Sequence, residues 1–210
     1  MRHELQRVQS MNKDFIPLDT VYVMDSVLNY YESHGTQKDK MMANYLMGCV
    51  HRDRGNSPIA LEYYRKATKF ADTTDMDDVK TLSRIYGQIA DVFNRQRAPQ
   101  LEIKAEKEAV RLALKAKDTI TAINYYAYLA GPYHMMNKMD SALTINQTAI
   151  NEFTKMGRKD LAAGFLPTAI DIYLRKKNFE EVKKLMSIYE QESGLVKNGE
   201  VSSEHELYYS

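Results

Sequence analysis

The sequence predicts an all-α chain whose helices pair into hairpins, which stack into a right-handed α–α superhelix (a solenoid). Glycine and proline are sparse, with 9 and 5 among 210 residues, so long stretches carry no turn signal. The β-branched residues do not gather into the alternating runs that are typical of strands. Similar residues also recur at a fixed interval, which indicates a repeat architecture.

The composition excludes several classes of protein. The formal net charge is +1, with 29 basic and 28 acidic residues. This balance argues against nucleic acid or an anionic membrane as the main partner, because both require a basic excess. There is no run of about 18 apolar residues, so no membrane span is predicted. The N-terminal segment MRHELQRVQSMNKDF lacks the apolar centre of a signal peptide.

The predicted helices are separated by short turns that contain glycine, proline or a capping residue. Gly35 ends the first helix and Gly55 ends the second. Asn56 or Ser57 can cap the third helix, and Pro58 fits its first turn, where a missing N–H costs nothing. The predicted helices cover residues 19–34, 38–54, 58–70, 77–96, 99–117, 119–137, 140–156, 159–176 and 179–193.

Later helices carry their own start and kink signals. Asp140 and Asn178 are the predicted N-caps of two second helices. Pro132 and Pro167 lie inside predicted first helices. An interior proline costs about 3 kcal/mol and bends a helix. We therefore expect kinks at both places, which would shape or widen the surface that the first helices share.

These elements predict three parts of the chain. Residues 1–37 form an N-terminal segment with a capping helix, and residues 38–196 form four helical hairpins. Residues 197–210 form a tail that ends in Glu206-Leu-Tyr-Tyr-Ser210. Because this ending is apolar and helix-like, the tail is predicted to begin a further repeat of a longer natural chain.

The repeat is visible at two sets of anchor residues, most of them small, with one set in each helix of a hairpin. The first helices carry Gly48, Ala90, Ala130 and Ile170, and the second helices carry Ala67, Ala109, Ala149 and Tyr189. Both sets are spaced by about 40 residues, slightly more between the first two members. Small side chains let two helices approach closely, and large residues such as Tyr64 and Tyr133 then fill the gaps between hairpins.

The residues around these anchors resemble the tetratricopeptide repeat (TPR), whose pattern is W-x2-L-G-x2-Y, then A-x3-F, then A. The first copy carries Asn44, Met47, Gly48, His51, Ala60, Tyr64 and Ala67, and the third carries Tyr126, Leu129, Ala130, Tyr133, Ala142, Asn146 and Ala149. The second copy departs from the pattern, because Glu102 and Glu106 replace its small and aromatic positions. The fourth has Ile170 in place of the small residue, and the closing proline is absent throughout.

The resemblance implies a concave groove, lined by the first helices, that holds a peptide or a partner domain. The implied groove residues are Tyr45, Arg52, Asp53, Arg84, Asp91, Asn94, Arg95, Asn124, His134, Asp171 and Arg175. Such a mixture can bind a peptide by hydrogen bonds and ion pairs. Two other interpretations stay open: the groove is only a solvated polar face, or another part of the same chain fills it.

A narrower resemblance is to TPR proteins of the Bacteroidetes, carried by DSVLNYYESHG and KMMANYLMGCVHRDRGNSPIALEYYRKAT. Many such proteins are exported and lipid-anchored, and some carry a membrane helix and a helix-turn-helix region further along. The resemblance implies an interaction scaffold or, alternatively, the sensor half of a membrane-linked transcriptional regulator. A helical enzyme or accessory domain is a further alternative, which predicts a deep pocket with convergent titratable groups.

No catalytic or metal-binding motif is found. Cys49 is the single cysteine, and it is predicted to be a buried filler rather than a nucleophile. The five histidines do not fall at metal-ligand spacing on one helix. The acidic segment DTTDMDD lacks the glycine and late glutamate of a calcium loop. We therefore predict no enzyme activity and no cofactor, and leave the oligomeric state open.

Overall fold

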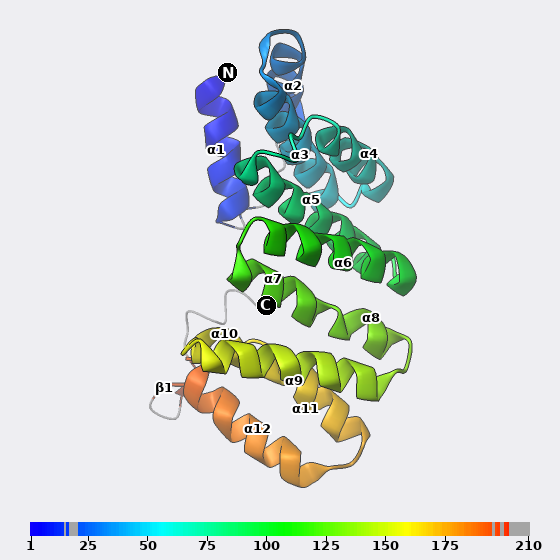
Figure 1. Cartoon of the computed structure of the whole chain (residues 1–210), viewed down its shortest axis with the longest axis vertical. Coiled ribbons are helices and arrows are strands. Elements are labelled where there is room, and N and C mark those ends of the chain that lie inside the picture. The colour runs from blue at the N-terminus through cyan, green and yellow to red at the C-terminus, as the bar shows by residue number, and fades with distance from the viewer. Residues whose placement is uncertain (15, 17–20, 195, 198–199, 202–210) are drawn as a thin grey trace. The chain divides into compact units, whose positions relative to one another are not determined.

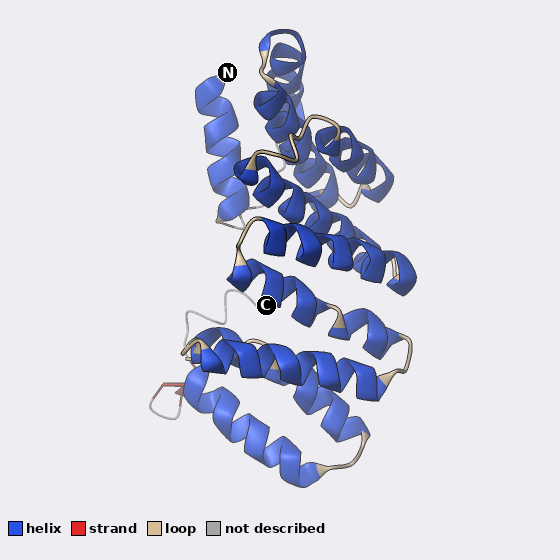
Figure 2. Ribbon diagram, in the orientation of Figure 1, coloured by secondary structure: helices blue, strands red, loops and turns tan. Residues whose placement is uncertain are grey.

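The computed structural model describes residues 1–14, 16, 21–194, 196–197 and 200–201 (Figure 1). The chain divides into two compact units, Met1–Ala122 and Ile123–Ser210. The start of the predicted helix 19–34 and most of the tail lie outside the described residues. Figure 2 shows that the described chain is almost entirely helical.

The first unit consists of paired helices and an additional N-terminal helix. Its helices are α1 (Arg2–Lys13), α2 (Val21–His34), α3 (Gln37–Asp53), α4 (Ser57–Thr68), α5 (Met76–Arg95) and α6 (Pro99–Lys115). Helices α3 and α4 form one hairpin, α5 and α6 form the next, and α4 packs on α5. Helix α2 packs on α3, and α1 contacts both α2 and α3. Helix α7 (Thr119–Tyr128) begins in this unit.

The second unit repeats this arrangement with interrupted first helices. It contains α8 (Ala130–Met135), α9 (Met139–Lys155), α10 (Lys159–Ala163), α11 (Leu166–Arg175) and α12 (Phe179–Glu192). Helix α8 pairs with α9, and α11 pairs with α12. Two short antiparallel strands, β1 (Val196–Lys197) and β2 (Glu200–Val201), follow.

The turns that follow six of these helices share one conformation. In each turn a residue with φ between 53° and 74° follows the helix. The N–H of the next residue donates to a carbonyl five residues back, for example from Ala98 to Phe93 at 2.9 Å. This is the Schellman motif, which satisfies the last carbonyls of a helix. The residues with positive φ are Gly55, Arg97, Lys117, Asn137, Gly157 and Lys177.

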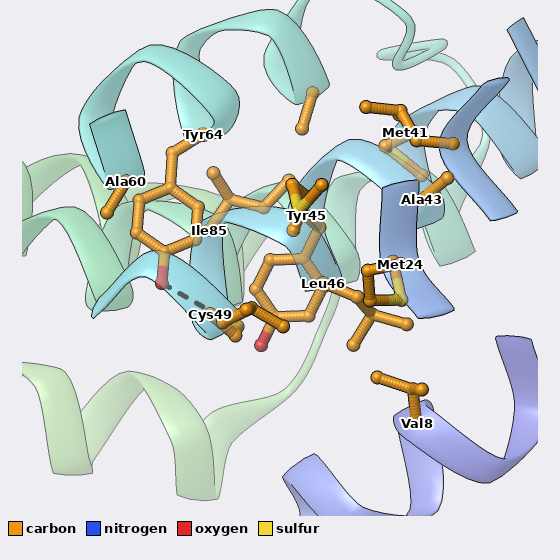
Figure 3. Close-up of a cluster of buried hydrophobic side chains, with 14 of the residues drawn as sticks. Val8, Met24, Met41, Ala43, Tyr45, Leu46, Cys49, Ala60, Tyr64 and Ile85 are labelled. Atoms are coloured by element: carbon orange, nitrogen blue, oxygen red, sulfur yellow. Dashed lines mark hydrogen bonds between the residues drawn. The ribbon is translucent and has the colours of Figure 1, made fainter. Parts of the chain in front are cut away.

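The core of the first unit confirms the predicted use of small anchors. Gly48, Ala67, Ala90 and Ala109 are all fully buried. The side chain that lies closest to Gly48 is the ring of Tyr64 on α4. A methyl group on Gly48 would lie 2.4 Å from Cε1 of Tyr64. The Tyr64 hydroxyl donates to Sγ of Cys49 at 3.6 Å (Figure 3).

The structure corrects three details of the predicted helices. The predicted helix 119–137 breaks at Leu129 into α7 and α8, and the predicted helix 159–176 breaks between Ala163 and Leu166. Both breaks lie just before a proline, whose ring cannot follow a regular helical turn. Asp140 is not a cap, because it lies in the first turn of α9. Asn178 is confirmed as a cap and accepts from the Glu181 N–H at 3.3 Å.

Helix α1 was not predicted from the sequence. It has three apolar residues that meet the core of the first unit, namely Leu5, Val8 and Met11, and the remainder of the helix is polar. So few apolar residues do not mark an amphipathic helix reliably. Helix α1 packs on α2 and α3, and these tertiary contacts cannot be seen in the local sequence of residues 2–13.

Candidate peptide-binding surface

Helix α5 presents a polar stripe on one face. Arg84, Gln88, Asp91 and Arg95 follow one another by four, three and four residues, so they lie on the same side of the helix. Arg84 is exposed and has no ion-pair or hydrogen-bond partner among the described residues. Nε of Arg95 lies 3.0 Å from the Asp91 carboxylate, and both side chains face solvent. We call these four residues the α5 stripe.

The C-terminal end of α3 is tied to the α5 stripe. The Arg52 guanidinium pairs with Asp53 at 2.6 Å, and its Nη1 donates to Oε1 of Gln88. The Arg52 and Asp53 side chains are 15% and 16% exposed, so the ion pair is largely desolvated. Helix α3 therefore holds Gln88 in place, and the open part of the surface lies along α5.

Asn94 is a predicted groove residue whose side chain turns away from the α5 stripe. Its Nδ2 donates to Oε1 of Glu102 on α6 at 2.9 Å. Asn94 is thus engaged with the second helix of its own hairpin. Its predicted neighbours Arg84, Asp91 and Arg95 remain together on the stripe.

Tyr45, another predicted groove residue, is covered by α1. Its side chain is 7% exposed, and its hydroxyl accepts a hydrogen bond from Nδ2 of Asn12 at 3.4 Å. Tyr45 and Arg52 are seven residues apart, which is about two turns, so they share one face of α3. Helix α1 therefore lies on the N-terminal half of the face that ends at Arg52.

The second unit brings together three of its four predicted residues. Asp171 on α11 lies 3.0 Å from Nε of Arg175 and 3.1 Å from Nε2 of His134 on α8. The contact with His134 has the distance of an ion pair but not the angle of a hydrogen bond. This cluster joins two successive first helices. Asn124 on α7 is half-buried.

Two carboxyl groups of α6 are buried, and their burial was not predicted from the sequence. Glu102 and Glu106 on α6 are 3% and 4% exposed, and one oxygen of each has no hydrogen-bond partner. Burial raises the pKa of Glu106 to about 9, and the nearby Glu102 and Asp91 carboxylates add to this effect. Burial also raises the pKa of Glu102, which the hydrogen bond from Asn94 opposes. The sequence does contain a sign of these buried carboxyl groups, because Glu102 and Glu106 occupy the small and aromatic positions of the repeat pattern.

Cys49 and His51 carry side chains that could react or bind a metal, but both make packing contacts here. Cys49 is buried, and burial raises the pKa of its thiol to about 11, so the reactive thiolate is disfavoured. The ring of His51 stacks on that of Tyr63 with centroids 5.4 Å apart. No group of three or more potential metal ligands is found among the described residues. None of the described helices combines the length and apolar content that crossing a membrane requires.

An open cavity of about 330 Å³ lies in the second unit between α9 and α11. Its lining residues are Leu143, Thr144, Gln147, Thr148, Asn151 and Tyr173. The Gln147 amide donates to Oδ1 of Asn151 at 3.1 Å, and the hydroxyls of Thr144 and Thr148 donate to carbonyls of their own helix. Tyr173 is the single titratable side chain of this lining, so the cavity does not assemble convergent titratable groups.

Comparison with solved structures identifies the fold. The chain matches no protein-family model and no curated protein sequence. It is similar to the crystal structure of the nearly identical TPR-like repeats of a protein described as a kinesin light chain from Podosopora anserina, with a TM-score of 0.71 and 9% identity over 92% of this chain and 94% of that one. It is also similar to BtubC (BKLC) from P. vanneervenii, with a TM-score of 0.63 and 13% identity over 96% of this chain and 93% of that one. These matches confirm the predicted fold class, an all-α superhelix of TPR-like repeats.

Proposed function

We propose that the chain is a protein-interaction scaffold that binds a peptide or a partner domain through its first helices. The observation that carries this proposal is the α5 stripe, where two arginines and one aspartate remain exposed on a rigid first helix. The helix fixes the backbone that carries these side chains, so no backbone segment has to be ordered when a ligand binds them. Arg84 in particular has all its donors available to a carboxylate or a backbone carbonyl.

The fold supports the same proposal. TPR-like repeats present one surface made of first helices, and the contact between Arg52 and Gln88 joins two of these helices here. The α5 stripe carries both signs of charge, which favours a partner segment with an acidic residue opposite Arg84 and mixed polar residues beyond it. The second unit carries a separate polar cluster on its own first helices, formed by His134, Asp171 and Arg175.

A selection of peptides from a displayed library tests this proposal. Peptides that bind the wild-type chain should lose at least tenfold in affinity for the double variant Arg84→Glu/Arg95→Glu, since charge-assisted hydrogen bonds contribute about 1.5–3 kcal/mol each. The matched control is the double variant Lys107→Glu/Arg111→Glu, which makes the same change in net charge, because both side chains are exposed on the second helix α6.

Fluorescence anisotropy measures the three affinities. Equal loss in the double variant and in the control would mean that binding follows net charge and not the α5 stripe. Retention of full affinity by the double variant would contradict the proposal directly.

A further inference from the structure

Helix α1 occupies part of the face that the proposed function assigns to a ligand. Val8 is fully buried, and Leu5 is 7% exposed. Figure 3 shows Val8 of α1 beside Met24 of α2 and Leu46 of α3. Asn12 adds the hydrogen bond to the hydroxyl of Tyr45. An amphipathic helix laid on a surface of two other helices is a recurring mode of peptide recognition.

The attachment of α1 is slight. Its apolar contacts come from Leu5, Val8 and the half-buried Met11. Its ion pair, between Arg7 and Glu4 at 3.0 Å, lies within the helix, and in the described part of the chain no ion pair links α1 to another helix. A helix of 12 residues without a side-chain N-cap is marginal by itself in water. Helix α1 therefore depends on docking for its structure.

The surface beneath α1 is apolar and needs a cover. Met24 and Val27 on α2 and Leu46 on α3 are fully buried in the same apolar cluster as Val8 and Tyr45. An uncovered apolar patch of this kind marks an interaction site or an aggregation hazard in a protein. Any partner that removes α1 must therefore bring apolar side chains of its own.

We propose that α1 is a removable intramolecular ligand of the α2–α3 face, and that the partner which displaces it is an amphipathic helix. This inference rests on the proposed function and names the partner's form. The partner helix carries apolar residues at positions i, i+3 and i+6, as in Leu5, Val8 and Met11. It carries an amide or hydroxyl donor at i+7, where Asn12 reaches Tyr45. Its binding is gated by the undocking of α1.

The test uses the full chain and a labelled, end-blocked peptide of residues 2–13 as the probe. The variant Leu5→Asp/Val8→Asp places two charges on the docked face of α1. The control Gln6→Asp/Ser10→Asp places two charges on its exposed face. The docking variant should bind the probe at least tenfold more tightly than the wild type and the control do. A probe with the same two aspartates should not bind.

Equal affinity of the wild type and the folded docking variant would overturn the inference. Hydrogen exchange of the wild type gives a second measurement that needs no variant. Amides of α1 should exchange at least a hundredfold faster than those of α3, because undocking is local. Exchange of α1 as slow as that of α3 would show that α1 is an integral part of the core, and would also overturn the inference.

The two proposals fail in different ways. If library peptides bind the wild type and the docking variant alike, yet depend on Arg84 and Arg95, the gating role of α1 is wrong and the proposed function stands. If the docking variant captures the probe but no library peptide depends on the α5 stripe, α1 is a removable ligand and the role of the stripe is wrong.

Discussion

The buried carboxyl group of Glu106 should make the stability of the protein fall as pH rises. In the native state burial raises its pKa from the usual 4.5 to about 9. The unfolded chain loses this proton near pH 4.5, whereas the native chain keeps it until about pH 9. The unfolded state therefore binds fewer protons over this interval. The contribution of Glu106 is fully present below pH 4.5 and is lost as pH rises through 9.

The size of the effect follows from the linkage between protonation and folding. One fully shifted group changes the free energy of unfolding by at most about 1.4 kcal/mol for each pH unit. Between pH 5.5 and 7.5 we expect Glu106 to lower the free energy of unfolding by about 2 kcal/mol, which allows for partial hydration of a 4% exposed side chain. The substitution Glu106→Gln removes the titration and nearly preserves the shape.

Urea denaturation followed by circular dichroism at pH 5.5, 6.5 and 7.5 measures this effect. The variant minus wild-type difference in unfolding free energy should rise by about 2 kcal/mol across the interval. Glu108→Gln is the control, because the hydrogen bond from Arg111 lowers the pKa of Glu108, so it is ionised in both states above pH 5.5. Parallel pH profiles for the wild type and Glu106→Gln would refute the reasoning.

Three further predictions follow from packing and backbone geometry. Gly48→Ala should destabilise the chain by about 1–3 kcal/mol, since the new methyl meets the Tyr64 ring at 2.4 Å, whereas the control Gly164→Ala, whose nearest contact is 3.4 Å, should be nearly neutral in urea denaturation. Lys117→Gly should stabilise it by about 0.5–1 kcal/mol, because φ at this position is 57°, and an unchanged or lower Tm would contradict this. The Cys49 thiol should react with Ellman's reagent only as fast as the chain opens, and a burst at native conditions would show that it is accessible.

The sequence predicted the paired helices well because local signals agree there with the packing. The turn at Gly55 and Pro58 separates α3 from α4 almost where it was expected. The small anchors Gly48 and Ala67 then mark the buried sides of these helices. The breaks before Pro132 and Pro167 were anticipated as bends, but a gap of one or two residues depends on tertiary contacts that a pattern does not contain.

The candidate site could be predicted only in part. Helical spacing placed Arg84, Asp91 and Arg95 on one face, and the structure shows them together on the α5 stripe. Spacing could not show that α1 covers Tyr45, because that contact joins residues 33 positions apart. Helical spacing also could not show that the Asn94 side chain turns toward α6. Its hydrogen-bond partner there is Glu102, which occupies a position where the repeat pattern has a small residue.

Mapping where a selected peptide binds tests most directly whether the first helices form the binding surface. Backbone amide resonances of the chain are assigned, and their shifts are followed during titration with a library peptide of known affinity. If the first helices bind the peptide, the largest changes should lie on α3 and α5, at and around the α5 stripe, and the resonances of α4 and α6 should stay nearly unchanged. Changes that concentrate on the second helices α4 and α6 would contradict the proposed binding surface.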